Sequence, residues 1–111
     1  MNKPIIFHLK RIWKGKDLCE EILSGKKTSE WRDGKSFWSK RLFKDGRIVD
    51  VDFMTKNFGK REVDYTKYLK SRIGWIVFGY PKNNFPRIVV NIESVIYHVD
   101  TNQFEIKFSY S

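Results

Sequence analysis

Eight consecutive residues, 25–32, bring an amine, a carboxylate and a guanidinium close together and read G-x-K-x-x-E-x-R. If residues 28–32 form a regular strand, the side chains alternate and Glu30 and Arg32 share one face. A carboxylate beside a guanidinium can close a corner of the fold as a structural ion pair. It can equally orient the guanidinium toward a phosphate or a base edge. The sequence leaves both interpretations open, and Lys27 reaches the same rim if the corner bends.

Binding of nucleic acid is the first chemistry that these residue types suggest. Amines and guanidiniums contact phosphates and base edges, and an exposed aromatic ring stacks on a base. Trp31 lies inside the segment, and the basic pair that follows it adds positive charge. We therefore expect nucleic-acid contacts from Lys27, Glu30, Trp31, Arg32, Lys40 and Arg41.

Hydrolysis is the second chemistry. In a desolvated cleft the pKa values of Lys and Glu move toward neutrality, so Lys27 could act as general acid or oxyanion stabiliser and Glu30 as general base. The chain has no Ser-His-Asp or Cys-His pattern. His8 and His98 lie in strand-like patterns without a partner at catalytic spacing, which favours structural or exposed roles.

No metal or cofactor is expected. The single cysteine, Cys19, excludes an intrachain disulfide, and together with His8 and His98 it is too little for a four-ligand zinc site.

The composition predicts one folded domain, residues 1–111, with a polyanionic partner. The net charge is +9, and 41% hydrophobic residues suffice for a core. Residues 1–87 hold 21 basic against 10 acidic residues and residues 88–111 hold one against three, so the basic surface is expected in the first three quarters. No apolar stretch approaches the length of a membrane span, from which we expect a soluble, cytoplasmic protein. A module that binds an acidic protein also fits this composition.

The elements that position residues 25–32 follow from hydrophobic periodicity. Period-two patterns predict strands at 5–9, 49–53, 88–92 and 104–110. Residues 28–32 are expected to be extended, and the apolar run 75–78 suits a strand buried on both faces. The strands 75–78, 88–92 and 104–110 are expected to form an antiparallel meander. A helix is predicted over 17–24 with Asp17 as its cap and Gly25 as its stop, a second after Ser36 as N-cap, and a helical turn capped by Asp64. Residues 56–62 are predicted as a loop. The expected fold is α+β, a small, closed or nearly closed β-barrel of about six mostly antiparallel strands with two or three short peripheral helices.

The segment, the short helix before it and residues 37–42 after it resemble the ASCH domain family of the PUA-like superfamily, with all four signature positions matched: Gly25, Lys27, Glu30 and Arg32. The resemblance covers most of the chain. It implies a β-barrel with a cleft beside the signature that binds RNA or nucleotides and, in some members, hydrolyses them.

Two enzymatic branches of that family differ from this chain in instructive ways. Members that act on N4-acetylcytidine have a Thr nucleophile where this chain has Glu30, and a later helical Glu for which Glu62, in the predicted loop, is no clear counterpart. Members that act as metal-independent ribonucleases use Lys, Tyr and Ser side chains. The candidates for that role here are Lys27, Tyr65 or Tyr68, and Ser29 or Ser71.

Overall fold

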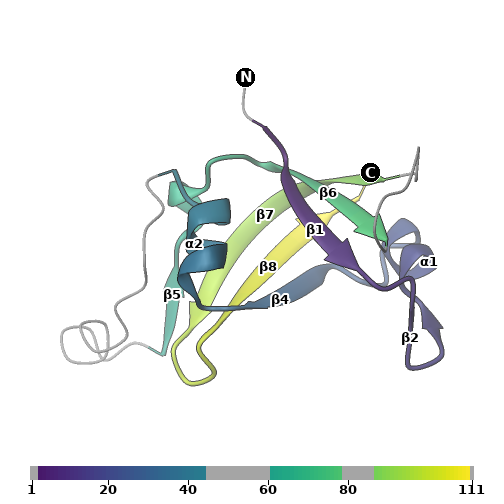
Figure 1. Ribbon diagram of the computed structural model, residues 1–111, viewed down its shortest axis with the longest axis horizontal. Coiled ribbons are helices and arrows are strands. Elements are labelled where there is room, and N and C mark those ends of the chain that lie inside the picture. Colours follow the sequence, from purple (N-terminus) through teal and green to yellow (C-terminus); the bar gives the residue numbers. More distant parts are fainter. Residues whose placement is uncertain (1–2, 45–60, 79–86, 111) are drawn as a thin grey trace.

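The computed structural model describes residues 3–44, 61–78 and 87–110, and the structural statements below concern these residues. The elements in chain order are β1 (Ile5–Leu9), β2 (Ile12–Trp13), β3 (Lys16–Asp17), α1 (Leu18–Leu23), β4 (Ser29–Asp33), α2 (Ser36–Leu42), β5 (Glu62–Asp64), the 3-10 helix η1 (Thr66–Tyr68), β6 (Ile73–Phe78), β7 (Ile88–His98) and β8 (Gln103–Ser109). In Figure 1, α1 and α2 lie at opposite ends of one curled sheet.

That sheet confirms the predicted α+β fold with a small, curled barrel. Its strand order is β1-β6-β7-β8-β4, and β5 pairs with the far end of β7. β6, β7 and β8 form the predicted antiparallel meander, β4 adds to it antiparallel, and β1 joins β6 in parallel. The described sheet therefore has β1 and β4 at the two ends of its path.

Side-chain alternation builds the core, with one shift of phase. Ile88, Val90 and Ile92 are buried as predicted, and beyond them the buried positions are Val95 and Tyr97. A β-bulge between Ile92 and Ser94 inserts one residue and so moves the inward face from even to odd positions. The other strands contribute Ile5, Phe7, Leu9, Ile76, Phe78, Phe104, Ile106 and Phe108.

The helix predictions are largely confirmed. The Asp17 side chain caps α1 by accepting a hydrogen bond from the Glu20 amide, and Gly25 leaves the helix at a φ of +80°. The predicted cap Ser36 is wrong, because the N-cap of α2 is Lys35, whose extended backbone precedes the helix without a side-chain cap. The turn after Asp64 is η1.

The structure differs from the sequence-based expectations at two further places. Glu62 lies in a strand, β5, because Glu62–Asp64 pairs with Ile96–His98 of β7. The hairpin of β2 and β3 was not predicted, and Lys14 and Gly15 form its turn with φ values of 51° and 76°. The strand predicted at 49–53 lies outside the described residues. Within the described residues, no helix is long and apolar enough to cross a membrane.

Candidate functional site: a cleft beside residues 25–32

The end of α1 positions the signature segment, residues 25–32. After Ser24 the chain turns back, and the amides of Lys26 and Lys27 both donate to the carbonyl of Glu21, at 2.8 and 2.9 Å. The left-handed backbone of Gly25 makes this exit possible, since a residue with a Cβ is strained there. The corner therefore delivers Lys27 to the start of β4.

Lys27, Glu30 and Arg32 form one chain of charges. The Glu30 carboxylate lies between the Lys27 Nζ, at 3.7 Å from Oε2, and the Arg32 Nη1, at 2.9 Å from Oε1. All three side chains are about four-fifths buried, with exposed fractions of 21%, 16% and 19%. Glu30 and Arg32 share a face as predicted, and two cations surround one carboxylate.

Arg32 also connects two strands of the sheet. Its Nη1 donates to the carbonyl of Trp31 at 2.8 Å, and its Nη2 donates to the carbonyl of His8 at 3.1 Å. Its guanidinium carbon lies 5.3 Å from the ring centroid of Trp38. His8 belongs to β1 and Arg32 to β4, the two ends of the strand path, so Arg32 joins them across the barrel. These contacts support the structural interpretation of Arg32.

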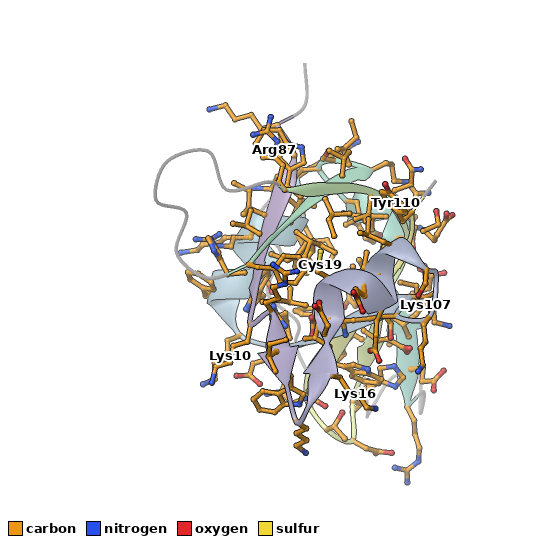
Figure 2. The ribbon with its side chains drawn as sticks, turned by 90° about the vertical axis from the view of Figure 1, so that its right-hand side faces the viewer. Lys10, Lys16, Cys19, Arg87, Lys107 and Tyr110 are labelled. Atoms are coloured by element: carbon orange, nitrogen blue, oxygen red, sulfur yellow. The ribbon has the colours of Figure 1, made fainter. Side chains whose placement is uncertain are left out.

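A cleft of about 340 Å³ opens beside this triad. We call it the signature cleft, and its lining is His8, Leu9, Lys10, Trp13, Leu18, Lys27, Glu30 and Arg32. Trp13 is 48% exposed, and the ammonium groups of Lys10 and Lys14 lie 5.4 and 5.7 Å from its ring centroid. Figure 2 faces this end of the molecule, with Lys10 on one side and Lys16 on the hairpin. The lip of the signature cleft thus carries an aromatic ring flanked by cations.

The hairpin residues at this lip were missed by the sequence analysis. Trp13 and Lys10 are not among the residues from which the sequence predicts nucleic-acid contacts. The available signal was Gly15, since a two-residue hairpin turn with two positive φ angles favours glycine at its second position.

Trp31, Lys40 and Arg41 do not line the signature cleft. Trp31 points to the opposite face of β4, where it lines a second pocket of about 400 Å³ and its ring lies 4.7 Å from that of His98. Lys40 and Arg41 occupy the last turn of α2. Arg41 stacks over Phe37 at 4.4 Å.

His98 has partners that spacing did not reveal. Its Nε2 lies 2.9 Å from Glu105 Oε1 and its Nδ1 lies 3.5 Å from Glu62 Oε1. These contacts join β5, β7 and β8 on the Trp31 side of the sheet. The ring of His8, in contrast, is exposed and borders the signature cleft.

The proposed ribonuclease set is not assembled at the signature cleft. Tyr65, Tyr68 and Ser71 lie in or next to η1, and Ser29 is on the same face of β4 as Trp31. Among the described residues that line the cleft, Lys27 is the only member of that set.

A scan against protein-family models, a search of curated proteins and a search of solved structures each found no match. The basis for a function is therefore the geometry of the signature cleft.

Proposed function

We propose that this chain is an intracellular module of ASCH and PUA-like type that binds single-stranded RNA or nucleotides in the signature cleft. The observation that carries the proposal is the placement of Lys27 in that cleft beside an exposed aromatic ring flanked by cations. Phosphates require the cations, and an unpaired base can lie on the ring.

Each of the cleft residues has a separate role in binding. Lys27 contacts a phosphate, and Glu30 holds the Lys27 ammonium in place and accepts a hydrogen bond from a base amine. Trp13 provides the stacking surface, an interaction worth about 1–3 kcal/mol per base. Arg32 pairs with Glu30 from the other side and supports the fold around the cleft.

Fluorescence anisotropy of end-labelled single-stranded RNA tests the proposal, with the wild type and with Lys27→Ala and Trp13→Ala. Lys107→Ala is the matched control, since Lys107 is exposed on β8, on the flank opposite Lys10 in Figure 2. We expect Trp13→Ala to weaken binding about 5- to 150-fold, the equivalent of one lost stacking contact. Lys27→Ala should weaken binding and make the salt dependence shallower by about 0.7.

Equal affinities for all four proteins would contradict the proposal. Absence of RNA binding by the wild type, together with salt-sensitive capture of an acidic protein, would instead identify a protein-binding module.

The pairing of Lys27 with Glu30 favours hydrolysis as a second candidate function. Glu30 would remove a proton from water, and Lys27 would stabilise the negative charge that develops on a phosphodiester or on the amide of a modified nucleoside. In the same experiment, cleavage makes anisotropy fall below its starting value with time. Full turnover by Lys27→Ala would exclude this assignment.

A further inference from the structure

A second basic surface lies away from the signature cleft. Residues 36–44 and 66–72 contain no aspartate or glutamate, and their cations are Lys40, Arg41, Lys44, Lys67, Lys70 and Arg72. The two segments are distant in sequence, so the fold itself must gather these charges.

Backbone pairing brings the two segments together. Phe43 and Leu69, both buried, form an isolated antiparallel bridge. On either side of it the amide of Lys44 donates to the carbonyl of Tyr68 at 3.0 Å and the amide of Lys70 donates to the carbonyl of Leu42 at 2.9 Å. Because Phe43 and Leu69 point into the core, the residues that follow them, Lys44 and Lys70, are directed away from it.

The result is a polar pocket of about 300 Å³, which we call the α2–η1 pocket. It is lined by Leu69 and by the polar residues Lys44, Thr66, Lys67, Lys70, Ser71 and Arg72. Its described lining includes no carboxylate.

Of the four cations that line this pocket, one is held by backbone carbonyls and three have no ion-pair partner within residues 3–44, 61–78 and 87–110. Arg72 is fixed by donating to the carbonyls of Ile92 and Glu93, at 3.0 and 2.8 Å. None of Lys44, Lys67 and Lys70 forms an ion pair with another described residue. The Asp64 carboxylate, hydrogen-bonded to Thr66, offsets part of the Arg72 charge. The three lysines still repel one another, and an anion in the pocket reduces that repulsion.

Helix α2 connects this pocket with the signature cleft. Trp38 lies in the first turn of the helix. Its ring centroid is 5.3 Å from the guanidinium carbon of Arg32, at the cleft, and 5.9 Å from that of Arg41, in the last turn. The helix then leads through Phe43 to Lys44. Cations therefore follow α2 from one site to the other.

We propose that single-stranded RNA longer than the signature cleft crosses α2 and places a backbone phosphate in the α2–η1 pocket. The inference rests on the proposed function, because it assigns the path of the strand beyond the cleft. The ligand group is a phosphodiester, since the pocket offers cations and hydroxyls and one apolar side chain. Lys40 and Arg41, on the crossing, contact the strand between the two sites.

The test compares a labelled RNA of about 3 nucleotides with one of about 16 nucleotides, within the range of single-strand site sizes. The proteins are the wild type, Lys67→Ala/Lys70→Ala and the control pair Lys3→Ala/Lys107→Ala, which has the same net charge and changes exposed lysines outside both sites. Loss of the one phosphate that these lysines neutralise lowers the salt slope by about 0.7, so affinity for the long RNA should fall roughly fourfold at about 0.15 M salt. The control pair should stay within about twofold, and the short RNA should bind the wild type and the pocket variant equally.

Three outcomes separate the two proposals. Loss of affinity for the long RNA alone supports the α2–η1 pocket. If both RNAs bind the pocket variant as tightly as they bind the wild type, the pocket assignment is wrong and the cleft stands. If neither the short nor the long RNA binds the wild type, the proposed function is wrong, and the pocket assignment is wrong with it.

Discussion

At the scale of single residues, the main result is that Lys27 and Arg32 have different roles. Both are cations of the signature segment and both contact Glu30. Arg32 uses its planar, forked guanidinium to reach the carbonyls of Trp31 and His8 as well, which a lysine ammonium cannot reproduce in one geometry. Lys27 has the Glu30 contact at 3.7 Å and faces the cleft. Arg32 therefore supports the site from which Lys27 acts.

We predict that Arg32→Lys destabilises the protein without changing its affinity for RNA. Loss of the guanidinium hydrogen bonds to the His8 and Trp31 carbonyls should cost about 2 kcal/mol, seen as a fall of roughly 10 °C in Tm. Thermal unfolding followed by circular dichroism measures this, and anisotropy below the new Tm measures affinity. A variant with unchanged Tm and weakened RNA binding would show that Arg32 contacts the ligand directly.

At the scale of elements, η1 has an internal brace that positions the α2–η1 pocket. The Asp64 carboxylate accepts hydrogen bonds from the amide and the hydroxyl of Thr66, and that hydroxyl in turn accepts from the Val95 amide of β7 at 3.1 Å. The Thr66 bonds, with a smaller effect of Arg72, lower the pKa of Asp64 below its usual value. One carboxylate thus joins η1 to the sheet.

The brace predicts a specific acid sensitivity. Because the pKa of Asp64 is lower in the folded state than in the unfolded state, its stabilising effect is complete above the unfolded value, about 3.9, and is lost as pH falls through the folded value. Urea unfolding at about pH 7, 5 and 3 should show the wild type losing more stability than Asp64→Asn over the acid interval. Parallel acid profiles for the two proteins would mean that the Asp64 charge does not brace η1.

The elements also show how far sequence reasoning reaches. Alternation over five or more residues predicted β1, the first part of β7 and β8, and capping chemistry predicted α1, because these signals are local. The hairpin of β2 and β3 has two residues in each strand, too few for a period to emerge. The contact between Arg32 and His8 spans 24 positions and arises only when the sheet curls. The sequence therefore predicted that Lys27, Glu30 and Arg32 lie together. Their separate roles, and the residues at the lip of the cleft, became visible only in the tertiary structure.

At the scale of the whole molecule, charge is segregated between the faces of the sheet. The signature cleft, α2 and η1 present cations. Among the described residues, the pocket beside Trp31 has the carboxylates of Glu62, Asp100 and, through His98, Glu105, and Arg61 is paired to Asp100. Asp100 and Glu105 come from the acidic last quarter of the sequence, whereas Glu62 comes from the basic part. A polyanion is consequently attracted to one side and repelled from the other.

This segregation predicts where bound RNA protects the backbone from hydrogen exchange. With the long RNA, protection should rise in residues 10–18 and 25–32 around the cleft and in 40–44 and 66–70 around the α2–η1 pocket. The β7–β8 turn, residues 99–103, should exchange at the same rate with and without RNA, because it lies beside the Trp31 pocket. At about 1 M salt, where the screening length falls to about 3 Å, protection around the α2–η1 pocket should vanish before protection at the cleft, since stacking on Trp13 resists salt better than phosphate contacts do. Protection centred on residues 99–103 would place the RNA on the acidic face and contradict both assignments.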